Sequence, residues 1–420
     1  MTPRERIVKA IHHQETDWLP VDIGATSATG INASALYRLT AYLGLPAKPP
    51  IINDTMQMLS QLDNELRSLL QTDVVPLPSP STKIGTKITG KYQPFIMPGN
   101  TPALLDETVK YTKDSEGNYY LYPQGDLSAP YSMKMTSDGS FFNCLDRIMS
   151  DEDSLTPRED FSDFNPAWSD DIARHYEQKS HELFEETDYA IACAFGQGGF
   201  GDLAKVPGPT VRRPRGIRTV ESFIMAHYLR PDYLHEVFSM QCDAALKNLN
   251  ILRQAVGDRI QLICMGGTDF GAQNGPYYAP EIYRELYKPY IRRLNDYVHG
   301  HTKWKTFWHS CGSIAGLLDD FIDAGVDITN PVQCSAAGMD PEHLKNTYGD
   351  RIVFWGGGVD TQHTLPFGTP TEVREQARLR IELFKPGGGF VFSSVHNIVA
   401  GVPPQNLAAL LAEVKRHRQG

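Results

Sequence analysis

Short runs of apolar residues recur over the second half of the chain, separated by longer amphipathic stretches. Runs that are apolar on both faces are typical of strands buried in a parallel sheet. The pattern predicts strands at 18–24, 189–195, 260–266, 305–310, 326–330, 352–356 and 389–394.

The stretches between these runs have the period of amphipathic helices. The clearest stripe recurs every four residues, at Ile282, Leu286, Tyr290, Leu294 and Val298. Pro289 interrupts the stripe, so we expect a kink there. Thr369 and Glu372 flank Pro370 in the pattern of a capping box, which marks a helix start. Helices are predicted at 2–13, 31–45, 54–71, 172–186, 219–228, 231–256, 279–299, 314–323, 341–348, 369–384 and 404–416.

Strands that alternate with helices form right-handed βαβ units and a parallel sheet. We therefore predict an α/β fold, a closed (β/α)8 TIM barrel with an N-terminal helical extension, as a single domain over residues 1–420. An open, doubly wound sheet is the alternative. Between about 84 and 145 the period changes to two, with glycine-containing turns between the runs. This change predicts a β-hairpin-rich insertion within the barrel domain.

Composition excludes several classes of partner. Forty Lys and Arg against fifty Asp and Glu give a net charge of −10, which disfavours nucleic acid and anionic membranes as partners. The N-terminus has no apolar segment of the secretory kind and the chain has no membrane-spanning run. Six widely spaced cysteines do not make a disulfide framework. We expect a cytoplasmic protein in which a special cysteine is a ligand or a nucleophile.

Polar residues follow most of the predicted strands. Asp269 follows one, His309 and Cys311 end the next, Cys334 follows a third, and His396 follows the last. The carboxyl ends of parallel strands share one rim, where catalytic groups gather. These side chains are therefore expected to lie around one mouth of the barrel.

His309 and Cys311 are two residues apart, which on a strand points both side chains to the same side. An imidazole nitrogen and a thiolate are ligands that Zn²⁺ prefers. A third ligand must come from another strand end, and His396, Cys334 and Asp269 are the alternatives. Taken alone, a His-x-Cys pair is more often a pair of core residues than half of a metal site.

Three segments of the chain resemble the uroporphyrinogen decarboxylase superfamily: HSCGSIAGLLDDFIDAGVDITNPVQ, FWGGGVDTQHTLPFGTPTEV and GGGFVFSSVHNIVAGVPPQNLAALL. The likeness is strongest from about residue 255 to the end, and it implies a (β/α)8 barrel. The superfamily contains decarboxylases that use no cofactor and zinc-dependent methyltransferases that work with a corrinoid. The decarboxylases carry an arginine-rich segment after the first strand, but residues 24–30 here contain no arginine.

The resemblance therefore favours the corrinoid-dependent methyltransferase branch. His309 and Cys311 match the His-x-Cys of that branch, and His396 stands where the branch has a second cysteine. This implies Zn²⁺ held by His309, Cys311 and His396, with a corrinoid (cobalamin) carried by a partner protein. An imidazole in place of a thiolate makes the metal a stronger Lewis acid. The resemblance thus implies a small methyl donor, such as a methoxylated compound, or a thiol acceptor.

Further roles are expected from position at the rim. Asp269 and Gln333 are predicted as catalytic residues, and four residues are predicted to bind substrate: Gln273, Asn274, Tyr277 and Tyr278. Specificity is expected to come from 84–145, 196–202 and 269–278. By resemblance the protein is expected to be a homodimer. A metal-free decarboxylase acting on a non-porphyrin acid, and a non-catalytic barrel that binds a corrinoid or tetrapyrrole, are the competing hypotheses.

Overall fold

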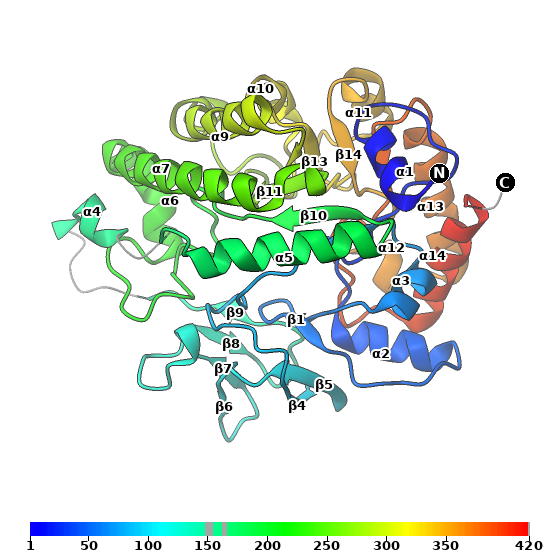
Figure 1. Cartoon of the computed structure of the whole chain (residues 1–420), viewed down its shortest axis with the longest axis horizontal. Helices are drawn as coiled ribbons and strands as arrows, with labels where there is room; N and C mark the ends of the chain where they lie inside the picture. Colours follow the sequence, from blue (N-terminus) through cyan, green and yellow to red (C-terminus); the bar gives the residue numbers. More distant parts are fainter. Residues whose placement is uncertain (148–153, 162–165, 419–420) are drawn as a thin grey trace.

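A computed structural model describes residues 1–147, 154–161 and 166–418 of the chain. Seven strands form one parallel sheet in the order β15-β14-β13-β12-β11-β10-β3 (Figure 1). Their bounds are β3 (Val74–Pro76), β10 (Ala190–Ala194), β11 (Leu262–Gly266), β12 (Lys305–His309), β13 (Ile328–Asn330), β14 (Val353–Trp355) and β15 (Phe390–Val391). This order follows the chain, as expected for a barrel rather than for an open sheet whose order reverses.

The eighth position of the barrel is filled by the segment around Val21. Val21 makes a parallel bridge to Phe392, next to β15. The Phe392 N–H donates to Pro20 O over 2.8 Å, and the Asp73 N–H, next to β3, donates to Val21 O over 2.7 Å. The predicted barrel is therefore confirmed, with the predicted strand 18–24 present as a single bridge that closes the sheet.

The predicted helix at 54–71 is wrong over most of its length. Asp54 accepts hydrogen bonds from the Met56 and Gln57 N–H groups, each over 2.9 Å, and so holds a turn that competes with a helix. Only its last part is helical. The segment holds the hairpin β1 (Ile52–Asp54) and β2 (Leu59–Ser60), then helix α3 (Asn64–Leu70). Strand β3, which follows, is only three residues long and was not predicted.

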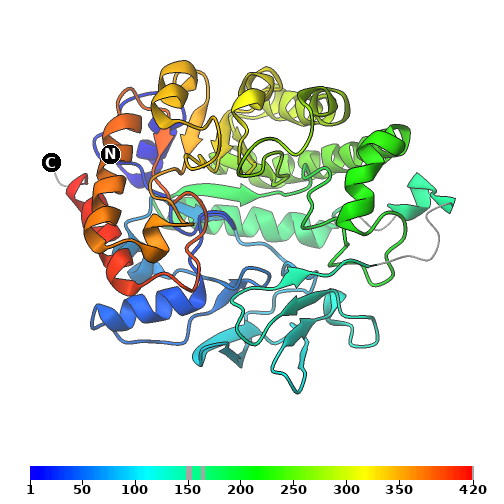
Figure 2. The same cartoon turned by 180° about the vertical axis from the view of Figure 1, so that it is seen from behind.

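Helices cover the outside of the barrel (Figures 1 and 2). The expected capping box is present at Thr369 and Glu372. A kink was expected at Pro289, which lacks a backbone N–H. The helix is irregular just before this residue, where Tyr283–Tyr287 form a π-helical turn. The helix bounds are α1 (Pro3–Ala10), α2 (Ala33–Tyr42), α4 (Pro157–Asp160), α5 (Asp170–Glu186), α6 (Val220–Leu229), α7 (Pro231–Val256), α8 (Pro280–Ile282), α9 (Lys288–His301), α10 (Leu318–Asp323), α11 (Pro341–Tyr348), α12 (Thr364–Phe367), α13 (Pro370–Phe384) and α14 (Pro404–Arg416).

The predicted hairpin-rich insertion lies to one side of the barrel, at the bottom of Figures 1 and 2. It contains an antiparallel pair and a four-stranded meander with a core of its own around Phe95, Tyr119 and Phe142. Its strands are β4 (Tyr92–Met97), β5 (Thr101–Asp106), β6 (Tyr111–Lys113), β7 (Tyr119–Leu121), β8 (Met133–Met135) and β9 (Asn143–Cys144).

Alternate residues of the barrel strands point inward and form a second core. Leu262, Phe307, Ile328 and Val353 belong to it, and Ile7 of α1 packs against them as part of a plug at the amino-terminal end of the strands. Burial of each such side chain contributes about 1.5–3 kcal/mol. On β12, β13 and β14, the residue two positions after the inward one also points inward and lies nearer the carboxyl end of its strand. We call this end of the barrel the mouth.

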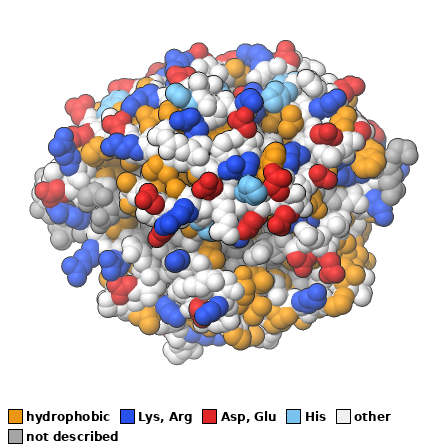
Figure 3. Space-filling model, in the orientation of Figure 1, with side chains coloured by type: hydrophobic (Ala, Val, Ile, Leu, Met, Phe, Trp, Pro, Cys, Tyr) orange, Lys and Arg blue, Asp and Glu red, His pale blue; other side chains and the backbone are white. Residues whose placement is uncertain are grey.

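The outer surface is mixed in character. Over the face in Figure 3, acidic and basic side chains are interspersed, and hydrophobic groups gather toward the insertion and α2. Exposed hydrophobic residues there include Tyr42, Tyr92 and Ile96. Among the described residues, no helix has both the length and the apolar character needed to span a membrane.

Candidate metal centre and the adjoining cavity

The register of the sheet positions the first candidate ligand. Phe307 on β12 points into the barrel, so His309, two residues later, also points inward, at the mouth. His309 pairs with Asn330 of β13 in the parallel ladder. Cys311 follows directly in the loop after β12, and the Cys311 N–H donates to Asp269 Oδ1 over 2.7 Å.

His309, Cys311 and His396 come together at the mouth, and we call them the triad. One ligand atom from each lies within 4.8 Å of the others. Cys311 Sγ and His309 Nε2 are 3.3 Å apart, and the rings of His309 and His396 have centroids 5.3 Å apart. Among the described residues this is the one cluster of its kind, and neither Cys334 nor Asp269 belongs to it. Of the three alternatives for a third ligand, the geometry thus favours His396.

Asn330 orients the His309 ring. His309 Nδ1 and Asn330 Oδ1 are 2.6 Å apart, and the Asn330 amide donates to Trp355 O over 2.7 Å. Because an amide oxygen can only accept, the proton of neutral His309 resides on Nδ1. The lone pair of Nε2 then faces the triad, as in metal sites whose histidines donate their other N–H to a fixed acceptor.

Burial gives the other two members of the triad opposite pKa shifts. It raises the pKa of the Cys311 thiol well above its usual value, and the negative charge of Asp269 adds to this effect. It lowers the pKa of His396 to about 4, and the charge of His309 acts in the same direction. At neutral pH His396 is therefore an uncharged imidazole that can offer a lone pair to a metal. Cys311 keeps its proton until a bound cation displaces it.

Asp269 and Gln333, the predicted catalytic residues, support the loop that carries Cys311. Asp269 Oδ1 lies 3.8 Å from His309 Nε2, and its side chain is partly exposed at the mouth. Gln333 Oε1 accepts from the Gly312 N–H over 2.8 Å, and its amide donates to Gln273 Oε1 over 2.9 Å. Asp269 is thus placed to contact a bound group, whereas Gln333 shapes the loop. Their catalytic roles stay predictions.

The predicted substrate-binding residues are spread over a wider area. Tyr277 is 44% exposed. Partial burial raises the pKa of its hydroxyl, and the charges of Asp269 and Cys311 add to this effect, which indicates that Tyr277 lies near them. Tyr278 is buried and stacks on His227 with ring centroids 4.2 Å apart. Gln273 is exposed and bonds to Ser335 O, and Asn274 is exposed. Their contact with substrate also stays a prediction.

A cavity of about 480 Å³ opens next to the triad, with His396 in its wall. The insertion contributes Phe141 and Asn143, the loop after β10 contributes Leu203, and Ile398 follows His396. The cavity therefore lies between the barrel mouth and the insertion. The four predicted substrate-binding residues are not part of this lining.

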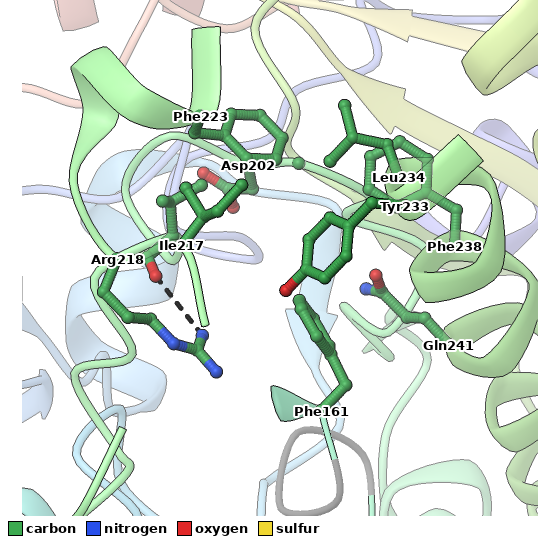
Figure 4. Close-up of a pocket in the computed structure, with 11 residues that line it drawn as sticks. Phe161, Asp202, Ile217, Arg218, Phe223, Tyr233, Leu234, Phe238 and Gln241 are labelled. Atoms are coloured by element: carbon green, nitrogen blue, oxygen red, sulfur yellow. Dashed lines mark hydrogen bonds between the residues drawn. The ribbon is translucent and has the colours of Figure 1, made fainter. Parts of the chain in front are cut away.

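The loop after β10 also carries Asp202, whose Oδ2 lies 3.4 Å from Lys205 Nζ. Burial raises the pKa of the Asp202 carboxyl, an effect that Lys205 opposes. The guanidinium of buried Arg218 fastens this loop, since it donates to Val206 O over 3.3 Å (Figure 4). It also donates to Asp160 O over 2.8 Å. The space beside Arg218 measures about 20 Å³, enough for a single water.

Three residues around the mouth were not predicted to have a role. Asn330 and Asp22 are buried polar residues within apolar runs, and such residues need a partner inside the fold. Asp22 Oδ2 accepts from Trp355 Nε1 over 2.9 Å. Asp202 ends a glycine-rich run that marks a loop but gives no direction for its side chain. A polar residue inside an apolar strand pattern is the signal that would have found the first two.

Comparison with known proteins places these residues in a family context. Residues 212–417 match the family model described as uroporphyrinogen decarboxylase. Curated proteins with that name are 26% identical over 242 residues in Paraburkholderia phytofirmans and 25% identical over 245 residues in Azoarcus sp.. The first match covers 56% of this chain and 56% of the relative, and the second 56% and 57%, so each spans little more than half of either protein.

A solved methyltransferase from Methanosarcina mazei has a similar structure over the whole chain. The TM-score is 0.54, the identity is 16%, and the superposition covers 100% of this chain and 99% of that one. At this identity the likeness establishes the fold, a TIM-barrel-like arrangement. The triad, by contrast, lies entirely within the segment that matches the family model.

Proposed function

This chain belongs to the uroporphyrinogen decarboxylase superfamily, and within it we propose a zinc-dependent methyltransferase that works with a corrinoid protein. The observation that carries the proposal is the convergence of His309, Cys311 and His396 at the mouth of the barrel. A metal-free decarboxylase has no need of a thiol beside two imidazoles. The methyltransferase of similar fold from Methanosarcina mazei is consistent with this branch.

The three side chains of the triad are suitable ligands for Zn²⁺. Two imidazoles and one thiol supply the nitrogen and sulfur ligands that zinc prefers, and three protein ligands are typical of catalytic zinc sites. Asn330 already holds the His309 ring with Nε2 toward the triad. When bound, the metal would polarise the heteroatom that carries or receives the methyl group.

The residues of the chain have separate tasks in this scheme. Burial keeps His396 uncharged at neutral pH, so that its lone pair stays available. Asp269 fixes the position of Cys311 through the backbone N–H and presents its carboxylate at the mouth. The cavity next to His396 is the place for the small methylated substrate. A reduced corrinoid on a partner protein would be the second reactant, presented at the same mouth.

The replacement of a thiolate by His396 favours methyl removal from an oxygen-bearing donor. A neutral imidazole donates less charge than a thiolate, which leaves the bound metal more electron-poor and better suited to an ether oxygen. We therefore propose a methoxylated compound as the donor, with a thiol acceptor as the second candidate. The proposed assembly is a homodimer in the cytoplasm.

The curated relatives are decarboxylases, so a lyase is the competing function. Porphyrinogen decarboxylation needs cations that bind several carboxylates. Residues 24–30 border the mouth, since Ser27 O accepts from the Asn397 amide over 3.3 Å, and they contain serine and threonine but no arginine. This observation argues against a polycarboxylate substrate.

Methyl transfer to cobalt is the direct test. The purified protein is mixed with a reduced corrinoid protein and methoxylated donors, and the cobalt absorbance is followed. We expect formation of methyl-cobalt with the wild type, slowed roughly 10³-fold or more in Cys311→Ala because metal polarisation supplies several kcal/mol. Cys334→Ala, outside the triad, is the control and should retain the rate. Turnover by metal-free wild type would refute the proposal.

A further inference from the structure

The cavity beside His396 has a distinctive chemical lining. Of its eighteen lining residues, eleven are apolar or a cysteine, five are uncharged amides or a serine, and the remaining two are His396 and Asp146. The lining residues are Asn32, Met56, Gln57, Leu59, Ser140, Phe141, Phe142, Asn143, Cys144, Asp146, Leu203, Ala204, Pro207, Val220, His396, Asn397, Ile398 and Val399. None of these described residues is a lysine or an arginine.

The cations next to lining residues are paired with other groups, as is Lys83, whose Nζ lies 3.7 Å from Asp54 Oδ2. Lys205 follows the lining residue Ala204, but its ammonium group faces Asp202 and donates to Gly196 O over 3.1 Å. Arg147 follows Asp146, and its guanidinium donates to the carbonyls of Gly208 and Val211. The stretches outside the described residues contain no lysine or arginine in their sequence. A carboxylate that binds away from His396 would therefore lose its hydration and meet no cationic side chain of the lining.

The lining also offers few interaction partners to a positively charged methyl donor. Asp146 is the one acidic residue of the lining, and its Oδ1 accepts from the Val220 N–H at the start of α6 over 3.2 Å. The aromatic residues of the lining are Phe141 and Phe142, adjacent in the chain, rather than the several faces of a cation-binding cage. Flat apolar groups suit such a wall.

Uncharged polar groups, by contrast, find partners. The Asn397 amide donates to Gln57 Oε1, and Asn397 also hydrogen-bonds with His396. Gln57 is half-buried, and among the described residues its Nε2 group has no recorded acceptor. Asn143 is exposed in the lining and makes no recorded side-chain bond to the described residues. Both amides can therefore bond to a hydroxyl or a carbonyl of a ligand.

We propose that this cavity is the methyl-donor site and that it selects an uncharged donor, an apolar ring with a neutral polar substituent, over donors that carry a carboxylate or a quaternary ammonium group. The inference rests on the proposed function only where it identifies the bound ligand as the methyl donor. The charge preference follows from the lining itself and is measurable by binding, without methyl transfer.

The test measures binding of three matched probes to the full-length protein by calorimetry at pH 7, with no corrinoid present. The metal-free form decides the charge preference of the lining, because a carboxylate cannot ligate zinc there, and the zinc-loaded form is measured beside it. The probes are 2-methoxyphenol, 2-methoxybenzoate and (2-methoxyphenyl)trimethylammonium. We expect 2-methoxyphenol to bind at least about tenfold tighter than either ion, because an ion without a partner loses several kcal/mol on burial. Equal or tighter binding of 2-methoxybenzoate or of the ammonium probe would overturn the inference.

A positive charge added to the lining should remove the preference for 2-methoxyphenol over 2-methoxybenzoate. Asn143→Arg is the first choice because Asn143 is exposed on β9 and its replacement disturbs no recorded side-chain bond; Gln57→Arg is the second variant. We expect either to tighten 2-methoxybenzoate binding about tenfold or more, as a charged hydrogen bond allows. Gln254→Arg, on an exposed position of α7, adds the same charge away from the cavity and should leave both affinities unchanged.

The outcomes separate the two proposals. If 2-methoxyphenol binds selectively but no donor methylates the corrinoid, the proposed function fails and the cavity assignment stands. If methyl transfer occurs but Asn143→Arg and Gln57→Arg alter neither affinity nor preference, the cavity assignment fails and the proposed function stands.

Discussion

The two halves of the chain contribute different parts of the site. From residue 212 onward, parallel strands place the triad at their carboxyl ends, and this half matches the family model. The first half closes the barrel with a single bridge at Val21 and then forms the insertion, whose residues 140–144 line the cavity. The position of the ligands thus depends on barrel register, whereas the shape of the cavity depends on hairpins outside it.

This division implies that chemistry and specificity can vary separately. His309 is fixed by its ladder partner Asn330 and by β12, which is paired on both sides. The insertion packs around a separate core that includes Phe95 and Phe142, so we expect changes there to leave those strands in place. Substitutions in the two halves should accordingly affect different measurements.

The largest expected effect is loss of the metal from the second half. The wild type should bind about one zinc per chain, and His309→Ala or Cys311→Ala should weaken zinc binding by about 10³-fold or more, since a catalytic zinc site rests on three protein ligands. His396→Cys should retain zinc, because a thiolate is an equally good ligand. Elemental analysis after dialysis against a weak chelator measures all three. Full zinc occupancy in Cys311→Ala would show that the metal lies elsewhere.

The free energy of unfolding should depend on pH through Asp22 of the first half, which bonds to Trp355 of the second half. Burial raises the pKa of its carboxyl from 3.8 to about 6. Between these values the native state binds more protons than the unfolded state, so this group lowers the free energy of unfolding as the pH rises from about 4 to 6. Asp22→Asn removes that dependence, and relative to wild type the variant should gain up to about 3 kcal/mol between pH 4 and pH 7.

Urea unfolding at both pH values measures the Asp22 effect. Asp22→Asn keeps one oxygen that can accept from the Trp355 indole, so the variant is expected to fold. The difference between the two pH values is the informative quantity, since a constant loss of stability at both would reflect the altered hydrogen bonds alone. Parallel curves for wild type and variant would mean that folding leaves the pKa of Asp22 unchanged.

The two halves also differed in how far their structure was predictable. In the second half, apolar runs of five or more residues between capped helices predicted five strands in the right order, and the two-residue spacing of His309 and Cys311 predicted their common direction. In the first half, the turn held by Asp54 replaced a predicted helix, and β3 is too short to leave a periodic pattern. Tertiary contacts decide such segments, and one sequence does not show them.

The same limit explains the site. The ligands follow from strand ends, which a sequence pattern marks, but the cavity joins residues 32, 57, 143 and 397, which no local pattern connects. The expected contribution of 84–145 to specificity agrees with the part of the lining that the insertion provides. Gln273 and Gln333 were predicted to orient substrate because they follow strands. In the fold they bond to each other, and Gln333 also bonds to the Cys311 loop, while their contact with substrate stays a prediction.

A smaller effect on the metal is expected from Asn330→Ala. The His309 ring would lose the acceptor that fixes its tautomer, while all three ligands remain. Loss of such a partner typically weakens metal binding about 10–100-fold. Zinc affinity by competition with a chelator measures this effect, and Asn330→Asp, which keeps an acceptor at the same place, should restore most of it. An unchanged affinity in Asn330→Ala would mean that the sheet alone orients His309.

The smallest expected effect isolates the insertion. Phe141 is 44% exposed and lines the cavity, so Phe141→Ala removes apolar wall without opening a core. Donor binding should weaken about three- to tenfold, the range of one aromatic contact. Zinc content should stay at the wild-type level, because the triad lies on other elements. Tyr92→Ala, an exposed aromatic on β4 outside the cavity lining, is the matched control and should change neither quantity. If Phe141→Ala lowered the zinc content as well, the two halves would not act separately, because the insertion would then help to hold the metal.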